Sequence, residues 1–537
     1  MSRMSYKAAY EAFDLAIAAD VLSNGLRPGI NAAFECCDRH ATVRPDAPAL
    51  FYESDDQSTA LTFGELWTKS ARFADFLARQ NIAPGDCIAA LVPRGCELMI
   101  AAVATWRLGA VFLPLFTAFG DTAIDHRLRH AQARLLLVDE GNRNKLDGLD
   151  HLPTVITVSK SGARDGDFDF WTELNAASPR LEPVGLMPES PFLRMFTSGT
   201  TGKPKSLDVP LRALVAFAGY MREGIELMPE DRFWNLADPG WAYGLYYALI
   251  GPLLLGHSTT FYSGAFDAEK TIRVIRRRGI TNLAGSPTAF RLLMVAGAEA
   301  VMPIKDQLRM ISSAGEPLPP EINRWFQEHL GVAIHDHYGQ TELGMVVANH
   351  NAFDRFARAG SAGFPSPGYR VAVLDDAGSE VGIGVPGEMA IDRSQSPLFW
   401  FQGYREAPPS PDRYYRTGDA AEWCSDGSLT FVGRTDDVIT SSGYRIGPFD
   451  VESVLAEHAA ILEAAVIGKP DPERTEIVKA FVVLKPEIEP APALAESLKQ
   501  HVRKRLSAHA YPREIEFVSE LPKTPSGKVQ RFLLRSL

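Results

Sequence analysis

A stretch rich in hydroxyl groups and glycine, Thr197 to Lys205, is the part of the sequence best suited to binding phosphate. It holds four hydroxyl side chains, two glycines and two lysines directly after the largely apolar residues 192–196. Glycines let backbone N–H groups turn inward, hydroxyls donate hydrogen bonds and lysines offset negative charge. A Walker P-loop is excluded, because that motif needs Gly where Thr197 stands and Ser or Thr where Pro204 follows Lys203.

Further along the chain, short segments combine glycines, rings, hydroxyls and charges that suit a nucleotide. Residues 313–317 read Ser-Ala-Gly-Glu-Pro between an expected strand and an expected helix, where open α/β sheets bind ligands. Residues 336–342, Asp-His-Tyr-Gly-Gln-Thr-Glu, offer a flat ring for a base, a hydroxyl for a phosphate oxygen and a hard carboxylate for a hard cation. The remaining segments are Tyr414–Asp419, Gly433–Asp437, Ser441–Gly447 and Leu521–Lys528.

These segments together resemble the acyl-adenylate-forming superfamily, which includes acyl-CoA synthetases, adenylation domains of peptide synthetases and luciferases. Thr-Ser-Gly-Thr-Thr-Gly-Lys-Pro-Lys is similar to the phosphate loop of that superfamily, and the later segments follow in its order. The resemblance covers about residues 30 to 537. It is strongest to the medium-chain acyl-CoA synthetases.

The resemblance implies a set of nucleotide contacts. Tyr338 would pack on adenine, Thr341 would touch the α-phosphate, and Asp419 would accept both ribose hydroxyls. Glu342 would bind Mg²⁺, a cation that takes oxygen ligands. The full set that the resemblance places around ATP or AMP is Thr197, Ser198, Gly199, Thr200, Thr201, Lys205, Gly315, Glu316, Pro317, Tyr338, Gly339, Thr341, Asp419, Arg434 and Arg445.

The resemblance also names catalytic and CoA-binding residues. The catalytic residues would be Lys528, Glu342 and Thr197, with Lys528 reaching the carboxylate and the α-phosphate as charge moves to the leaving pyrophosphate. Gly443 would line the pantetheine tunnel, and Asp436 would be the hinge about which the C-terminal domain swings. A protein acyltransferase could act on Lys528 and silence it by removing its charge.

The acyl pocket is expected near residues 241–245, Trp-Ala-Tyr-Gly-Leu, with Trp241, Ala242, Tyr243 and Gly339 as its lining. In acetyl-CoA synthetases the position before Gln-Thr-Glu is typically a tryptophan that closes the pocket. Gly339 stands there in this chain, so we expect space for an acid larger than acetate, and we expect Gly339→Trp to spare only small acids. The chain departs from the superfamily pattern at Ser206, often Gly, and at residues 209–211, which lack a histidine often found there.

Composition excludes several classes of function. The 537 residues are 46% hydrophobic and 23% charged, with a net charge of −11, so nucleic acid is not expected as the main partner. Five cysteines without metal-ligand spacing fit a reducing compartment. The most apolar run, residues 243–256, is too short for a membrane span, and the N-terminus does not read as a secretory signal. A cytoplasmic location is the expectation.

The order of apolar runs predicts an α/β fold. We expect a large N-terminal domain, residues 1–434, made of two α/β subdomains plus a small β region after about Gly360, and a structureless segment from Gly141 to about Met187. A small mobile α+β C-terminal domain should follow at 435–537. Thr62-Phe-Gly-Glu65 is typical of a capping box at a helix start.

The reaction implied by the resemblance has two halves. A carboxylate and Mg·ATP give acyl-AMP and pyrophosphate, and CoA then displaces AMP to give the thioester. The cofactors and co-substrates are thus ATP, Mg²⁺ and coenzyme A, and the enzyme is an acid–thiol ligase. A stand-alone adenylating enzyme that loads a carrier protein, a luciferase-like oxygenase and a non-catalytic nucleotide sensor remain alternatives. The sensor should have lost Glu342 or Lys528, and both are present.

Overall fold

The structure is a computed structural model that describes residues 4–180, 182–197, 204–355, 360–407, 410–441, 444–471, 474–506, 510–523 and 529–536. The side chains of Thr440, Tyr444 and Arg445 also lie outside the description. Predicted site residues that fall outside the described residues are Ser198, Gly199, Thr200, Thr201, Gly443 and Lys528.

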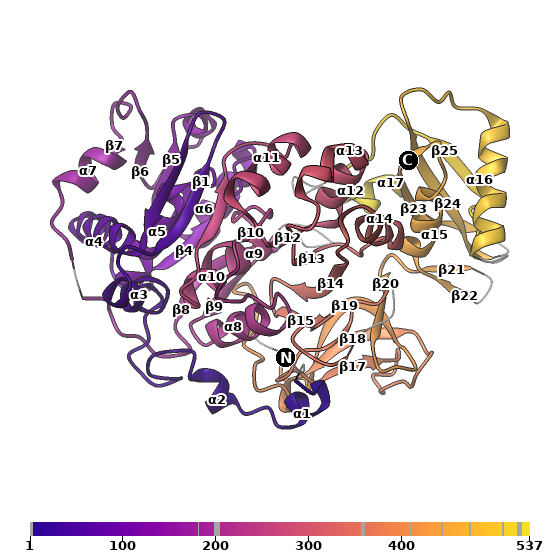
Figure 1. The fold of residues 1–537 in the computed structure, drawn as a ribbon, viewed down its shortest axis with the longest axis horizontal. Coiled ribbons are helices and arrows are strands. Elements are labelled where there is room, and N and C mark those ends of the chain that lie inside the picture. Colours follow the sequence, from indigo (N-terminus) through magenta and orange to yellow (C-terminus); the bar gives the residue numbers. More distant parts are fainter. Residues whose placement is uncertain are drawn as a thin grey trace.

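Two large sheets form the body of the N-terminal part (Figure 1). The first has the order β7-β6-β5-β3-β4-β8-β9 and carries helices α4 (Phe63–Arg79), α5 (Cys96–Arg107), α6 (Asp121–Ala131) and α7 (Phe170–Ala176). Its strands are β3 (Cys87–Leu91), β4 (Val111–Pro114), β5 (Ala133–Asp139), β6 (Thr154–Val158), β7 (Phe168–Asp169), β8 (Pro191–Thr197) and β9 (Lys205–Pro210).

The second large sheet has the order β10-β12-β13-β14-β15-β16, and its first four strands are parallel. Its strands are β10 (Phe233–Asn235), β12 (Asn282–Gly285), β13 (Met310–Ala314), β14 (Ile334–Gln340), β15 (Gly344–Ala348) and β16 (Phe364–Pro365). Helices in this half include α8 (Ala213–Glu223), α9 (Ala242–Gly244), α11 (Ala268–Arg278), α12 (Pro287–Val295) and α14 (Pro320–Leu330). The two sheets are the two α/β subdomains that the sequence predicts.

Two smaller sheets complete the N-terminal part. Strands β11 (Thr259–Tyr262), β1 (Pro48–Glu53) and β2 (Ser58–Thr62) form one of them. The other is antiparallel, with β17 (Val371–Leu374), β18 (Gly387–Asp392), β19 (Tyr414–Trp423) and β20 (Leu429–Arg434) in sequence order. It is the predicted small β region.

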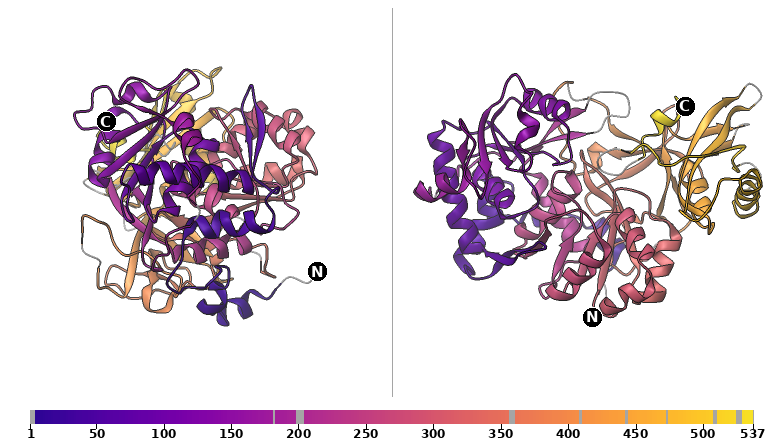
Figure 2. Two further views of the ribbon diagram at one scale, coloured as in Figure 1. Left: turned by 90° about the vertical axis from the view of Figure 1, so that its left-hand side faces the viewer. Right: turned by 90° about the horizontal axis from the view of Figure 1, so that it is seen from above.

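The C-terminal unit lies beside the N-terminal part as a separate lobe (Figure 2, right). Its sheet has the order β22-β21-β24-β23, with β25 on β24. The strands are β21 (Ile439–Ser441), β22 (Tyr444–Ile446), β23 (Ile461–Asp471), β24 (Thr475–Leu484) and β25 (Glu514–Phe517), and the helices are α15 (Pro448–Ala456), α16 (Pro492–Arg505) and α17 (Arg531–Leu534). The chain therefore crosses between the sheets within residues 434–439.

Local sequence explains why these elements form where they do. At the start of α4 the Thr62 hydroxyl accepts from the Glu65 amide at 3.2 Å, and the Glu65 carboxylate accepts from the Thr62 amide at 2.9 Å. This is the expected capping box, which satisfies amides that the first helical turn leaves unpaired. Helix α5 is buried from Leu98 to Arg107, and the Arg107 guanidinium donates to Asp38 at 2.8 Å, so its buried charge is paired.

The expectation of a structureless segment at residues 141–187 is wrong. Strand β6 lies there and pairs in parallel with β5, and β7 and α7 follow it. The residues Thr154-Val-Ile-Thr-Val158 are all β-branched, a composition that favours a strand. In the described residues no single helix is long and apolar enough to cross a membrane. The bent helix pair Pro287–Val295 and Ala298–Ile304 is long and apolar enough only when its two helices are taken together. The five cysteines are free thiols.

Candidate active site

A cavity of about 1610 Å³ runs between the carboxyl ends of the central strands, the small β region and the C-terminal unit. Its lining contains every predicted site residue whose side chain the structure describes: Thr197, Lys205, Trp241, Ala242, Tyr243, Gly315, Glu316, Pro317, Tyr338, Gly339, Thr341, Glu342, Asp419, Arg434 and Asp436. These residues come from segments up to 239 positions apart, 436 − 197 = 239, and the fold brings them to one space. Arg445 lies on β22, where its backbone pairs with Thr440.

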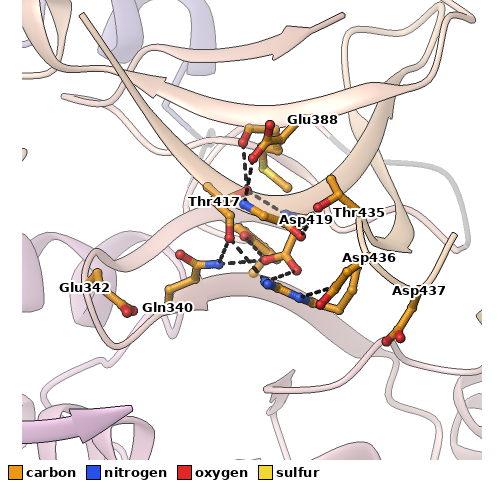
Figure 3. A network of polar contacts seen from close by, with 12 residues as sticks. Gln340, Glu342, Glu388, Thr417, Asp419, Thr435, Asp436 and Asp437 are labelled. Carbon is orange, nitrogen blue, oxygen red and sulfur yellow. Dashed lines mark hydrogen bonds and ion pairs between the residues drawn. The ribbon is translucent and has the colours of Figure 1, made fainter. Parts of the chain in front are cut away.

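Asp419 is the centre of the polar network at one end of the cavity (Figure 3). One carboxylate oxygen accepts from the Tyr338 hydroxyl at 2.5 Å and from the Gln340 amide at 2.7 Å. The other accepts from the Arg434 guanidinium at 2.9 Å. Asp419 is only 5% exposed, so these charge-assisted bonds fix its position before any ligand arrives.

The position before Asp419 on strand β19 needs glycine. Gly418 has a φ of +72°, and a Cβ there would lie 2.7 Å from a nitrogen of Arg434, so a side chain would both strain the backbone and displace the guanidinium. Arg434 in turn lies 3.4 Å from the carboxylate of Asp436. The guanidinium thus connects Asp419 to the residue predicted to be the hinge.

The strand ends of the second sheet supply a slot beside this network. Gly315 follows β13 with a φ of +97°, and the Glu316 carboxylate accepts from the Thr288 hydroxyl at 2.9 Å. Asp336, on the neighbouring strand β14, also lines the cavity. One of its carboxylate oxygens accepts from the Leu318 amide at 3.3 Å, and the other has no hydrogen-bond partner. Burial raises the pKa of Asp336 to about 8. Gly315, Glu316 and Asp336 line the part of the cavity that we call the slot.

Glu342 provides a carboxylate in the cavity lining. It is 7% exposed, and its oxygen accepts from the Tyr404 hydroxyl at 2.6 Å. Burial raises the pKa of Glu342, and the hydrogen bond from Tyr404 opposes that shift. Among the described residues no group of three or more His, Cys, Asp or Glu side chains could hold a metal ion. The residues fit Mg²⁺ in the way that nucleotide enzymes bind it, through one carboxylate together with substrate phosphates.

The stem of the phosphate loop is a β-hairpin. Thr197 ends β8 directly opposite Lys205, which begins β9, and both residues line the cavity. Ser206, where many superfamily members have Gly, is buried and donates through its hydroxyl to Glu406 at 2.6 Å. The serine therefore anchors the stem rather than contacting the cavity.

A second part of the cavity lining, the aromatic end, is formed by large rings. Trp241 lies 5.4 Å from Phe116 between ring centroids, and Tyr243 lies 5.8 Å from Tyr247. Ala242 begins the short helix α9 between the two large rings and also lines the cavity. The rings at this end give the cavity an apolar surface.

The structure contradicts the expectation that the missing side chain of Gly339 leaves space in the acyl pocket. A Cβ built there would lie 2.2 Å from the carbonyl oxygen of Gly344, on the neighbouring strand β15. The register of β14 and β15 shifts between Tyr338 and Gly339, and the missing side chain points into this hairpin. The expectation that a tryptophan at this position would simply fill the pocket is therefore wrong.

Sequence reasoning missed several residues that the structure places at the cavity. Gln340 and Asp336 lie inside a recognised segment without an assigned role, and Tyr404 lies outside all of them. An acidic residue on an expected strand of an α/β sheet, next to a segment that suits a nucleotide, could have marked Asp336. No signal marks Tyr404, because its contact with Glu342 joins positions 62 residues apart.

Comparisons with known proteins agree with the geometry. The model of the AMP-binding enzyme family matches residues 37–404, and the model of the AMP-binding enzyme C-terminal domain matches residues 450–528. The acetyl-coenzyme A synthetase of Bacillus subtilis is 36% identical over 545 residues, which cover 99% of this chain and 95% of that protein.

Solved structures show the same fold. The acyl-CoA synthetase of Brucella canis is 54% identical, with a TM-score of 0.81 and coverage of 100% of this chain and 99% of that one. The anthranilate CoA ligase AuaEII, solved with anthranoyl-AMP, is 28% identical, with a TM-score of 0.84 and coverage of 95% and 97%.

Proposed function

The chain belongs to the AMP-binding enzyme family and is an AMP-forming acyl-CoA synthetase, and we propose that its acid is larger than acetate: medium-chain, branched or aromatic. The observation that carries this proposal is the aromatic end of the cavity, where Trp241 and Tyr243 flank Ala242. Large rings with a small residue between them leave a broad apolar space. A larger acyl group fills that space at about 0.8 kcal/mol for each buried methylene.

We assign the nucleotide to the polar end. Asp419 would accept the ribose hydroxyls, with Arg434 and Gln340 holding its carboxylate. The slot at Gly315, Glu316 and Asp336 would take adenine beside Tyr338. Thr197 and Lys205 would meet the phosphates at the loop stem.

The chemistry then follows from charge. The acid's carboxylate oxygen attacks the α-phosphorus and the bond to the pyrophosphate breaks, so negative charge builds on the leaving group. Lys528 and Lys205 would offset that charge. Glu342 would hold Mg²⁺, which supplies further positive charge next to the phosphates when bound. In the second half the CoA thiol attacks the acyl carbon and AMP leaves.

The two halves need different surroundings, because charge-cancelling groups are required only in the first. We propose that the C-terminal unit turns about Asp436 between them, and that Gly443 then lines the path of pantetheine. Acylation of Lys528 by a protein acyltransferase would stop the first half by removing its charge.

Acetate is the second candidate acid, because the Bacillus subtilis relative is an acetyl-coenzyme A synthetase. A pyrophosphate-release assay with acetate, hexanoate, 2-methylpropanoate and benzoate, with the CoA thioester identified by mass, decides between the two. We expect the highest kcat/KM with one of the larger acids and thioester formation with free CoA. A preference for acetate over all three, or product only with a carrier protein, would contradict the proposal.

Two variants test the assignment of the half reactions. Lys528→Ala should slow acyl-AMP formation by roughly 10²–10³ and spare thioester formation from supplied acyl-AMP. Gly443→Leu should do the reverse, because a branched side chain would block a narrow tunnel. Equal loss in both half reactions would overturn either assignment.

A further inference from the structure

Tyr404 touches two predicted phosphate-site residues from a segment to which the assigned reaction gives no role. Its hydroxyl donates to Glu342 at 2.6 Å. The ammonium of Lys205 lies over its ring, 5.0 Å from the ring centre, within the range of a cation–π contact. Tyr404 itself lines the cavity. One side chain thus connects the predicted metal carboxylate to the lysine at the phosphate-loop stem.

The backbone of this segment is fastened to the same stem. Tyr404 forms a β-bridge with Leu207, and the Arg405 amide donates to the Ser206 carbonyl at 2.9 Å. The Glu406 carboxylate accepts from both the amide and the hydroxyl of Ser206. These bonds do not involve the Tyr404 side chain, so the segment keeps its place when that side chain is changed.

We propose that Tyr404 is a positioning residue for the metal step: its hydroxyl holds the Glu342 carboxylate in the orientation that receives Mg²⁺ with the nucleotide phosphates. The proposal rests on the function assigned to Glu342 above. A free glutamate can rotate about its side-chain bonds, and binding a metal must then stop that rotation. A hydrogen bond to one oxygen fixes the carboxylate beforehand.

The packing around Tyr404 supports a fixed hydroxyl. The ring lies 5.1 Å from Phe401 in an edge-on arrangement, and Phe401 in turn packs against Tyr415 at 5.3 Å. The hydroxyl of this packed ring donates to Glu342 at 2.6 Å. The ring also shields the ammonium of Lys205 on one face.

The hydroxyl can be removed while the ring and the backbone contacts are kept, by Tyr404→Phe. A matched control is Tyr414→Phe, which removes a similar hydrogen bond, from Tyr414 to Glu380 at 2.7 Å, outside the cavity lining. Glu342→Gln serves as the reference for loss of the metal carboxylate. Each protein is titrated calorimetrically with ATP at a series of Mg²⁺ concentrations without acid, and with AMP in metal-free buffer.

We expect Tyr404→Phe to need about 10- to 100-fold more Mg²⁺ than wild type for half of the maximal gain in ATP affinity. AMP binding should stay unchanged, since AMP needs no metal, and the Tyr414→Phe curve should match wild type. Saturating Mg²⁺ should restore kcat in Tyr404→Phe.

The possible results distinguish a failure of the positioning role proposed for Tyr404 from a failure of the metal-binding role proposed for Glu342. An unchanged Mg²⁺ midpoint in Tyr404→Phe beside a shifted one in Glu342→Gln would overturn the positioning role alone. Equal weakening of ATP and AMP in Tyr404→Phe would also overturn it, because a general disturbance of the site would be the cause. An unchanged midpoint in Glu342→Gln would instead contradict the metal assignment.

Discussion

The two ends of the cavity are built by different means. At the polar end, Asp419 is held by three side chains from two strands: Tyr338 and Gln340 on β14, and Arg434 on β20. At the aromatic end, Trp241 and Tyr243 flank Ala242 on one short segment and are held by ring packing against Phe116 and Tyr247. Directional bonds fix atoms to within fractions of an ångström, whereas ring packing fixes mainly a volume.

This difference predicts which part of the cavity tolerates substitutions. The proposed function assigns the nucleotide, which does not change with the acid, to the polar end, where a rigid arrangement suits it. The acid differs between relatives, as the names acetyl-coenzyme A synthetase and anthranilate CoA ligase show. We therefore expect substitutions at the polar end to change the affinity for ATP and those at the aromatic end to change the ranking of acids.

The largest effect should come from Asp419→Ala. It would remove the proposed acceptor of both ribose hydroxyls, and each hydrogen bond to a charged group contributes about 1.5–3 kcal/mol. We expect kcat/KM for ATP to fall by at least two orders of magnitude, about 3 kcal/mol, with the ranking of hexanoate and acetate unchanged. Steady-state kinetics with both acids checks this, and a reversed ranking would show that the two ends are not separate.

Gly339→Trp should disrupt the hairpin of β14 and β15 rather than reduce the volume of the acyl pocket. The Cβ would meet the Gly344 carbonyl, so β15 must move, at a cost of about 1–3 kcal/mol in the free energy of unfolding. Thermal unfolding should show a lower midpoint, and kcat/KM should fall for acetate as well as for hexanoate. A variant of normal stability that spared only acetate would restore the original expectation from the sequence.

A smaller, pH-dependent effect is expected at Asp336. Its pKa is raised by burial from 3.8 to about 8, so the folded protein keeps a proton there that the unfolded chain loses. The stability from this group is complete below the unfolded pKa and is lost as the pH rises toward 8, by at most about 1.4 kcal/mol per pH unit.

Asp336→Asn has no carboxyl group to ionise at this position. Its free energy of unfolding, relative to that of wild type, should therefore rise as the pH is raised from 5 to 7. Urea unfolding of both proteins at the two pH values measures the change. A difference that is the same at both would mean that Asp336 is already ionised in the folded protein.

Much of this site follows from the sequence because its residues lie in compact segments at strand ends. Helices α11 and α14 span residues 268–278 and 320–330, where apolar residues recur at helical spacing, so their positions follow from the sequence. Tyr338, Thr341 and Glu342 belong to one short segment of the sequence, so they also lie near one another in the fold. All three line the cavity.

What the sequence did not reveal depends on long-range pairing. The direction of Gly339 is set by a register shift with β15, and a shift of one residue turns a side chain to the other face. The partners of Glu342 and Asp419 include Tyr404 and Arg434 from other strands or loops, and no local pattern encodes such contacts. Strand β6 was missed for a different reason, since its polar flanks concealed a short β-branched run.

The most direct test of the account uses one ligand that spans both ends. Hydrolysis-resistant analogues of benzoyl-AMP, hexanoyl-AMP and acetyl-AMP share the nucleotide and differ only in the acyl group, so differences in their calorimetric Kd report the aromatic end alone. We predict that the better of the two larger analogues binds about 100-fold more tightly than the acetyl analogue, or about 3 kcal/mol for four further buried methylenes. Equal binding of all three, or tightest binding of the acetyl analogue, would contradict the assignment of a larger acid.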